Sequence, residues 1–205
     1  KIQTFSNMAL ERYLDDKEKV GGYLEKISNS AKRLRDLVTD LLNFSRISID
    51  ERFVKTDVNV IIEETLGDIE FAEADMSPVI HVDKIPVIEV IPLQMRQVFQ
   101  NLISNAFKFS RPDVAPEISI QAERVAEKSI DAKALESGKY CRITIRDNGI
   151  GFDDNYRHKI FEIFQRLNGK EAYEGTGIGL AIVKKVIERH DGIIAASGKE
   201  NDGAV

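Results

Sequence analysis

The sequence contains no tryptophan, one cysteine and three histidines in 205 residues. A single cysteine, Cys141, cannot form a disulfide within the chain, and such usage is typical of a reducing compartment. No apolar run approaches the roughly 18 residues that would indicate a membrane-spanning helix. Histidine, cysteine and carboxylate side chains do not group at metal-ligand spacing, so the pattern does not favour a transition-metal site.

An excess of positive charge is also missing. Lys and Arg number 29 against 34 Asp and Glu, which gives a formal net charge of −5. Proteins that bind nucleic acid usually present a basic face, so this balance gives no electrostatic support for a nucleic-acid partner. Hydrophobic residues make up 42% and charged residues 31%, which is ordinary for a globular chain with an ample core.

Residues 1–50 have the pattern of a helical hairpin. We predict helices over residues 2–14 and 23–47, with a turn at residues 15–22 that carries Gly21 and Gly22. Apolar residues of the second helix alternate steps of three and four, typical of a coiled coil or bundle: Leu24, Ile27, Ala31, Leu34, Val38 and Leu41. Two helices cannot bury this stripe alone, so we expect a four-helix bundle in a dimer. The alternative is that the hairpin packs on the rest of the chain.

Residues 51–205 mix helix and strand patterns, and we place the domain boundary near residues 48–52. Asp57 is predicted to cap a helix running to about residue 74, and Pro92 to open another. Residues 148–178 lack sustained periodicity, which in a compact domain usually marks a functional segment. The remaining predicted elements are strand 52–57, a hairpin of strands 79–83 and 86–90, strands 117–124 and 140–147 around a loop-like insertion, helix 179–192 ending at Gly192, and strand 193–197.

The stretch NLISNAFKFS, residues 101–110, lies within the helix that Pro92 opens. Asn101, Asn105 and Lys108 occupy positions i, i+4 and i+7, so two carboxamides and an ammonium share one helical face. Taken alone, this face is equally compatible with ordinary surface polarity. It gains meaning from two glycine-containing stretches further along the chain.

These stretches are DNGIGFD (147–153), which ends a predicted strand, and GTGIGL (175–180), which opens a helix. Neither matches a P-loop or a dinucleotide fingerprint, and DNG alone is compatible with a plain turn. Asp147 is a fixed anionic acceptor that suits an exocyclic amine such as that of adenine. Gly149 and Gly151 would let the backbone approach a flat base, while the helix start offers N–H groups to phosphates.

The asparagine face then suits the metal that accompanies a triphosphate. Magnesium prefers oxygen ligands, and asparagine oxygens add no negative charge beside the phosphates. Lys108 can offset phosphate charge, and Phe109 can pack on the base. Together the three stretches predict a site for magnesium and a nucleotide.

The same stretches resemble the conserved boxes of sensor histidine kinases. NLISNAFKFS resembles the N box, DNGIGF the G1 box, FEIFQRL (161–167) the F box and GTGIGLAI the G2 box. The hairpin resembles the dimerisation and histidine-phosphotransfer domain, and residues 162–192 are similar to kinases of the phytochrome-like group. The resemblance implies an α+β fold, a two-layer α/β sandwich shared with gyrase, Hsp90 and MutL.

By this resemblance, Asn105 is the magnesium ligand, with Asn101 beside it, and Asp147 contacts adenine N6. Phe161 and Phe164 would anchor a mobile lid at about residues 166–173. The implied nucleotide-binding set is Asn101, Asn105, Lys108, Phe109, Asp147, Gly149, Gly151, Gly175, Thr176, Gly177, Gly179 and Leu180. For Arg166 a phosphate contact and a surface ion pair remain equally open.

The family's phosphoacceptor histidine, which is followed by an acidic residue and soon a proline, has no match in this sequence. KIQTFSNMALER resembles the stretch just after that motif, so we expect the acceptor and a sensory domain upstream of Lys1. His81 fits a strand residue, His158 a solvent-facing residue near the lid, and His190 a cation at a helix end. The late glycines of the G3 box are not distinct, although Gly203 is a candidate.

The resemblance implies a protein-histidine kinase that uses ATP and Mg²⁺, forms a homodimer and passes phosphate to the aspartate of a response regulator receiver domain. This part of the parent chain is expected to be cytoplasmic, whether or not the parent is membrane-anchored. One rival is an ATP hydrolase of the gyrase type, which needs a carboxylate base on the N-box helix, yet no Asp or Glu lies between Pro92 and Phe109. A second rival is an inactive scaffold that only senses nucleotide.

Overall fold

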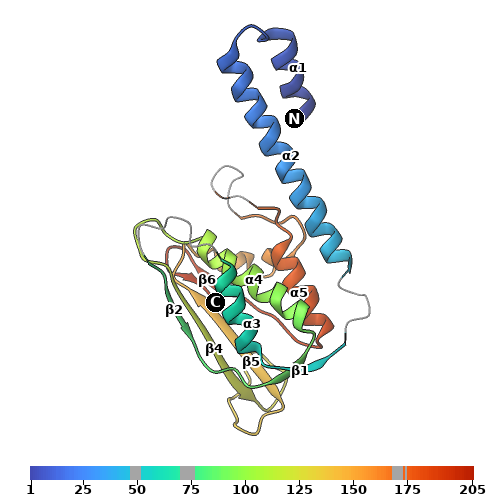
Figure 1. The fold of residues 1–205 in the computed structure, drawn as a ribbon. Coiled ribbons are helices and arrows are strands. Elements are labelled where there is room, and N and C mark those ends of the chain that lie inside the picture. The colour runs from blue at the N-terminus through green and yellow to red at the C-terminus, as the bar shows by residue number, and fades with distance from the viewer. Residues whose placement is uncertain (47–51, 70–76, 168–172, 174) are drawn as a thin grey trace. The chain divides into compact units, whose positions relative to one another are not determined.

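The computed structural model describes residues 1–46, 52–69, 77–167, 173 and 175–205, and Figure 1 labels its elements. The helices are α1 (Ile2–Arg12), α2 (Lys17–Arg46), α3 (Val58–Asp68), α4 (Pro92–Lys108), α5 (Gly179–Arg189) and the 3₁₀ turns η1 (Asp154–Tyr156) and η2 (Lys159–Phe161). The strands are β1 (Val54–Thr56), β2 (Val79–Val82), β3 (Ile88–Val90), β4 (Glu117–Val125), β5 (Tyr140–Asp147), β6 (Gly198–Lys199) and β7 (Gly203–Ala204). The chain divides into two compact units, Lys1–Arg46 and Ile47–Val205.

The first unit is a helical hairpin whose second helix is longer than predicted. The turn covers only the residues around Tyr13–Asp16, and α2 continues through Gly21 and Gly22. Asp16 favours this early start because its Oδ1 accepts a hydrogen bond from Lys19 N at 3.1 Å. Ring contacts of Tyr23 then hold the glycine-containing turn of α2 in place, with Phe5 of α1 at 6.1 Å and Tyr13, directly after α1, stacked at 5.7 Å.

Much of the predicted bundle seam remains exposed within this unit. Leu34 is 56% exposed, and Leu24, Val38 and Leu41 are also exposed. The α1–α2 hairpin therefore leaves an apolar face uncovered, which is the arrangement that the spacing of these residues predicts.

The second unit contains a three-stranded sheet in the order β2-β4-β5, with β2 parallel to β4 and β4 antiparallel to β5. A separate pair joins β1 to β3 in antiparallel register. The predicted hairpin of residues 79–83 and 86–90 is therefore wrong, because its two strands belong to different sheets. Buried Ile85 lies between them, and Asn59 holds its backbone with two hydrogen bonds of 2.8 and 2.9 Å.

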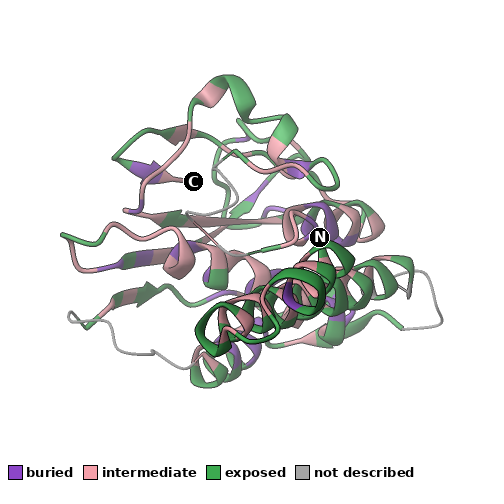
Figure 2. Ribbon diagram, turned by 90° about the horizontal axis from the view of Figure 1, so that it is seen from above, coloured by how far each residue is buried: buried purple, intermediate pink, exposed green. Residues whose placement is uncertain are grey.

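Helices α3, α4 and α5 lie side by side over one face of this sheet, α3 packing on α4 and α4 on α5 (Figure 1). Buried residues recur among exposed or half-buried ones along these helices, as expected for helices with one covered face, and Figure 2 colours the chain by burial. Fully buried side chains come from both layers and include Ile62, Phe99, Ile103, Ile118, Ile120, Ile182, Val183 and Val186. The α+β fold class, a two-layer α/β sandwich, is confirmed.

Local signals predicted several element ends correctly. Asp57 caps α3 through a 3.0 Å hydrogen bond from Asn59 N, and Pro92 occupies the first turn of α4. The third helix ends at Asp68, before the predicted residue 74, because Ile69 is extended; residues 70–74 lie outside the described residues. At the end of α5 the left-handed position is taken by Asp191, with φ 53°, and not by Gly192.

One further prediction needs correction. Residues 193–197 do not form a strand; the described chain instead ends in the short hairpin β6–β7. The insertion between β4 and β5 is loop-like, as predicted, and Arg142 Nη1 anchors it by donating to the carbonyls of Ile130 and Ala132 at 2.6 and 2.9 Å. No helix among the described residues combines the length and the apolar character needed to cross a membrane.

His190 joins the end of α5 to the start of α4. Its Nε2 accepts a hydrogen bond from Ile91 N at 3.0 Å, so its Nδ1 carries the proton and donates to Val186 O at 2.8 Å. Its ring meets Phe53 edge-on at 4.9 Å. Burial lowers the pKa of His190, against the bond to Val186, so the expected role as a helix-end cation is wrong.

We predict that the free energy of unfolding decreases as pH falls below about 6.5, the ordinary pKa of histidine. In this range the unfolded chain binds a proton on His190 that the folded chain does not bind. His190→Ala should remove this part of the pH dependence and cost about 1–3 kcal/mol, since Ile91 N–H loses its acceptor. Urea unfolding followed by circular dichroism measures the pH dependence and the loss of stability, with exposed His158→Ala as the control. An unchanged pH dependence in His190→Ala would contradict its assignment to His190.

Candidate functional site

The face of α4 that carries Asn101 lies against the start of α5. Asn101 Nδ2 donates to Gln97 O at 2.8 Å, which turns its Oδ1 outward from α4. A Cβ placed on Gly179 would lie 2.6 Å from that oxygen, so the two residues touch. Asn105 follows one turn later on α4 and is half-buried, and its carboxamide makes no hydrogen bond to the described part of the chain. The structure thus brings together the first and third stretches singled out in the sequence.

Lys108 extends this contact to the glycine segment before α5. A Cβ on Gly175 would lie 2.5 Å from Lys108 Nζ, and the same Nζ lies 4.5 Å from the centre of the Phe109 ring. The Phe109 ring in turn meets Tyr173 at 5.0 Å. The ammonium, the aromatic ring and the glycine backbone therefore form one continuous surface.

Asp147 ends β5 and points its carboxylate toward the glycine turn. Its Oδ1 accepts hydrogen bonds from Gly149 N at 2.9 Å and from Ala204 N at 3.3 Å. Burial raises the pKa of Asp147, and these two backbone N–H groups act in the opposite direction by stabilising the carboxylate. Both of these bonds go to Oδ1, so Oδ2 is the oxygen placed to accept from a ligand.

The backbone around Gly149 and Gly151 is packed against other backbone. Ile150 N donates to Phe109 O at 2.9 Å, and a Cβ on Gly149 would lie 2.5 Å from the same carbonyl oxygen. Gly151 has φ +63°, and a Cβ there would lie 1.9 Å from Lys199 O. These glycines therefore allow two backbone segments of the chain to pack closely together, in addition to any contact with a ligand.

The start of α5 offers backbone N–H groups in a fixed turn. Thr176 Oγ1 accepts from Ile178 N at 3.3 Å, and Gly177 O accepts from Phe164 N at 2.9 Å. Leu180 lies half-buried in the first turn of α5. The first amides of a helix have no partner within the helix, so this end favours an anion.

The residues predicted to hold a lid have mixed roles. Phe161 is buried, whereas Phe164 is 61% exposed and is held through its backbone. The guanidinium of Arg166 donates to Gly175 O at 2.8 Å and Tyr173 O at 2.5 Å, so it holds the segment before α5, and the choice between a phosphate contact and an ion pair stays a prediction. Most of the predicted lid, residues 168–172, lies outside the described residues.

Sequence reasoning missed the residues that support Asp147. Asn148 fixes the end of β5, because its Oδ1 accepts from Glu117 N and its Nδ2 donates to Ala115 O, both at 2.9 Å. The supporting N–H of Ala204 comes from β7. A backbone N–H donor has no characteristic residue type, so the sequence could not reveal it. The glycine predicted as a candidate, Gly203, was the one indication of this hairpin in the sequence.

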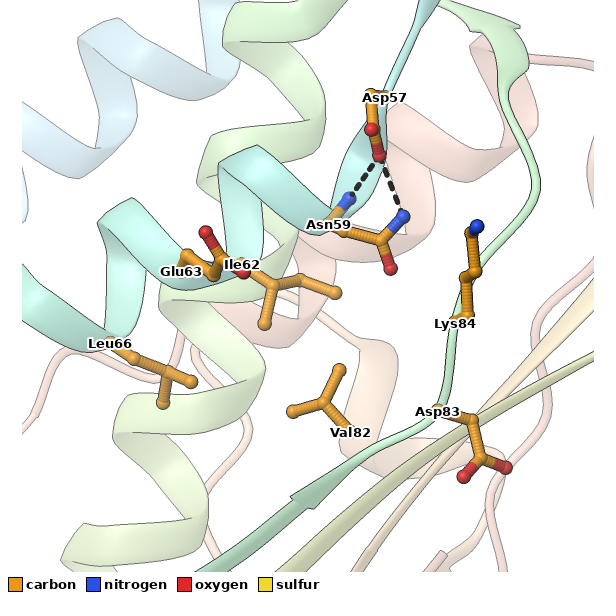
Figure 3. Close-up of a pocket in the computed structure, with 8 residues that line it drawn as sticks. All are labelled: Asp57, Asn59, Ile62, Glu63, Leu66, Val82, Asp83 and Lys84. Carbon is orange, nitrogen blue, oxygen red and sulfur yellow. Dashed lines mark hydrogen bonds between the residues drawn. The ribbon is translucent and has the colours of Figure 1, made fainter.

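A pocket of ≈ 350 Å³ lies elsewhere, between α3 and the end of β2 (Figure 3). Ile62, Leu66 and Val82 line its apolar part, and no residue of the predicted nucleotide set does. Asp57 and Asn59 at its edge already bond to each other, with Nδ2 to Oδ1 at 2.6 Å. Among the described residues, no group of three His, Cys, Asp or Glu side chains could hold a metal ion.

Comparison with known proteins identifies a family that matches much of the second unit and relatives that cover most of the chain. Residues 90–205 match the family described as histidine kinase-, DNA gyrase B-, and HSP90-like ATPase. Cyanobacterial phytochrome A of Nostoc sp. is 37% identical over 172 residues, which cover 83% of this chain and 21% of that protein. Sensor protein kinase WalK of Staphylococcus epidermidis is 32% identical over 196 residues, covering 92% of this chain and 30% of that protein.

Solved structures share the fold. The histidine kinase AdeS of Acinetobacter baumannii superposes with a TM-score of 0.68 at 20% identity, covering 99% of this chain and 89% of that one. Full-length ShkA in complex with AMPPNP gives a TM-score of 0.64 at 24% identity over 91% of this chain and 37% of that one. The chain spans less than a third of the length of the two curated relatives described above.

We predict that Gly151→Ala destabilises the second unit by about 2 kcal/mol or more, because a side chain is strained at positive φ and meets the carbonyl of Lys199. Gly67→Ala in α3 is the matched control. Nothing lies within 4 Å of a Cβ at Gly67, so alanine there should stabilise the helix by up to about 1 kcal/mol. Urea unfolding of both variants is the measurement; equal stability of the two would refute the close approach at Gly151.

Proposed function

The chain belongs to the family of histidine kinase-, DNA gyrase B- and HSP90-like ATPases, as the catalytic ATP-binding domain of a sensor histidine kinase. From this premise we propose that it holds Mg²⁺-ATP while the γ-phosphoryl group passes to a histidine of the parent protein. The observation that carries the proposal is the contact of Asn101 on α4 with Gly179 at the start of α5. At that contact an asparagine oxygen lies against the start of a helix, and Lys108, about two turns further along α4, adjoins Gly175 in the segment before it.

Asp147 is proposed to recognise the base. Its Oδ1 is held by two backbone N–H groups, so its Oδ2 can accept from the exocyclic amine of adenine. Guanine carries a carbonyl oxygen at that position, which a carboxylate repels. Phe109, which closes the same surface through its contact with Tyr173, is proposed to pack on the base.

Asn105 is proposed as a magnesium ligand, with Asn101 beside it. The donor set fits the ion, since carboxamide oxygens are hard, neutral ligands and magnesium retains several waters in such sites. When bound, the ion would neutralise phosphate charge and fix the triphosphate geometry. The occurrence of AMPPNP in the complex of ShkA supports a triphosphate in a site of this fold.

The phosphates are proposed to lie between Lys108 and the start of α5. Lys108 Nζ adjoins Gly175, and the amides of Thr176, Gly177 and Gly179 follow it along the chain to the start of α5. Leu180, in the first turn of α5, contributes its own N–H to this end of the helix. Phosphoryl transfer depends largely on such positioning and charge stabilisation.

The same helix argues against ATP hydrolysis as the main reaction. A hydrolase of the gyrase type needs a carboxylate base beside the magnesium ligands, and α4 from Pro92 to Lys108 contains no Asp or Glu. Transfer to a histidine needs no such base from this helix, because an imidazole is itself the nucleophile.

The hairpin is proposed to be part of a dimerisation and histidine-phosphotransfer domain in residues 1–50. The exposed apolar residues on α2 support a second copy of this chain as the partner. The proposal also includes an upstream sensory domain and a response regulator receiver domain that accepts the phosphate. It places this part of the parent protein in the cytoplasm. These parts of the proposal rest on the sensor kinases to which the chain is similar.

Asp147→Asn should weaken ATP binding by about tenfold or more, because a charge-assisted hydrogen bond contributes about 1.5–3 kcal/mol. Asp113→Asn removes an exposed carboxylate four residues after Phe109 and should leave the affinity unchanged. Calorimetry with ATP and with GTP, each with magnesium and with a chelator, is the test. Equal affinity for ATP and GTP would refute the base assignment, and absence of ATP binding would refute the proposed function.

Leu34→Glu should convert a dimer into a monomer, since a charge in the exposed apolar seam opposes its burial. Asn29→Glu adds the same charge on the opposite side of α2, five residues away at about 100° per residue, and should stay dimeric. Light scattering measures both masses. A monomeric mass for the unaltered chain would show that the hairpin does not self-associate through this face.

A further inference from the structure

The C-terminal hairpin β6–β7 is wrapped around the turn that follows Asp147. Gly203 is buried with φ +98°, and a Cβ there would lie 1.9 Å from Asp147 O. The next residue, Ala204, donates its N–H to Asp147 Oδ1 at 3.3 Å. At the tip of the hairpin, Asn201 N donates to Ile150 O at 2.7 Å. Three positions of the hairpin thus meet a four-residue segment that holds the base-recognising carboxylate.

This hairpin is too small to hold that position alone. Each strand has two residues, paired as Gly198 with Ala204 and Lys199 with Gly203. An isolated two-stranded hairpin is marginally stable in water even when it is longer. Its tip also includes Asn201 at φ 61°, an uncommon conformation for a residue other than glycine. The geometry at Asp147 therefore depends on contacts that the hairpin makes with the rest of the unit.

Arg111 supplies such a contact from the segment that follows α4. It follows α4 by three residues, and its Nη1 donates to Asn201 O at 2.7 Å. Its Nε is buried, so the side chain is packed against the protein along part of its length. Asn201 is therefore held at both backbone groups, by Arg111 through its carbonyl and by the glycine turn through its N–H.

These bonds connect the two halves of the proposed site. Arg111 and Phe109 both follow α4, which carries the proposed metal and phosphate residues. Phe109 O accepts from Ile150 N, and Arg111 reaches the hairpin tip that also bonds Ile150. The turn after Asp147 is thus enclosed between the end of α4 and the hairpin, and Arg111 is the side chain that joins these two supports.

We propose that Arg111 is a positioning residue for base recognition: by fixing the hairpin tip, it holds Ala204 N–H on Asp147 Oδ1 and so aims Oδ2 at an amine-bearing base. This inference rests on the proposed nucleotide function. It predicts that loss of Arg111 weakens the contribution of the exocyclic amine to binding, while contacts to the phosphates are retained.

The test compares ATP with inosine triphosphate, which carries an oxygen in place of that amine. Dissociation constants with magnesium are measured by calorimetry for the unaltered chain, Arg111→Ala and Arg111→Lys. Arg111→Ala should raise the constant for ATP about fivefold and change that for inosine triphosphate less than twofold. Arg111→Lys keeps one charged donor and should recover part of the ATP affinity.

Lys199→Ala is the matched control within the same hairpin. Lys199 pairs with Asp202 at 2.9 Å, and both side chains are largely exposed, so its loss should leave both constants unchanged. Circular dichroism establishes that each variant is folded. If Arg111→Ala is unfolded, the comparison of ATP with inosine triphosphate is made with Arg111→Lys.

The outcomes separate the two proposals. Equal weakening of both nucleotides by Arg111→Ala, or no weakening of either, overturns the role of Arg111 while the nucleotide function stands. Equal binding of both nucleotides by the unaltered chain overturns the Asp147 assignment and this inference with it. No binding of ATP by the unaltered chain overturns the proposed function itself.

Discussion

The hydrogen bond from Ile150 N to the carbonyl of Phe109 brings the end of α4 onto the turn that follows β5. Through this bond, α4 of the helical layer and β5 of the sheet are held together at their ends. The helix contributes Asn101, Asn105 and Lys108, and the strand contributes Asp147. Glycine at position 149 is a condition of this contact, because a Cβ would lie 2.5 Å from the same carbonyl oxygen. The spacing between Asp147 and the asparagines of α4, the proposed base acceptor and metal ligands, therefore depends on backbone packing.

The sequence predicted the fold where the signal was local. The cap at Asp57, the proline at the start of α4 and the alternation in β4 and β5 all involve neighbours in the chain. The pairing of β2 and β3 was predicted wrongly because adjacency was the only guide. Their partners, β4 and β1, lie dozens of residues away, and one pair is parallel. Helix α2 passes through two glycines because packing against α1 outweighs their low helix propensity.

The candidate site shows the same division. Side chains with distinctive chemistry, such as Asn105 and Asp147, could be proposed from residue type, spacing and the family resemblance. Their supports could not, because they act through backbone atoms or over long separations. Ala204 contributes an N–H, Gly203 an absence of side chain, and Arg111 reaches a carbonyl 90 residues ahead of it. Such partners have no characteristic residue type, so only the fold identifies them.

His190 gives the helix pair a fixed far end. It joins the last turn of α5 to Ile91, which precedes the first turn of α4, while the site lies at the opposite end of α5. Two rigid helices that are linked at one end can change their separation at the other end by rotating about that link. A motion of α5 relative to α4 that keeps these hydrogen bonds would therefore be a rotation about this imidazole, and Phe53, near the beginning of the second unit, lies against it.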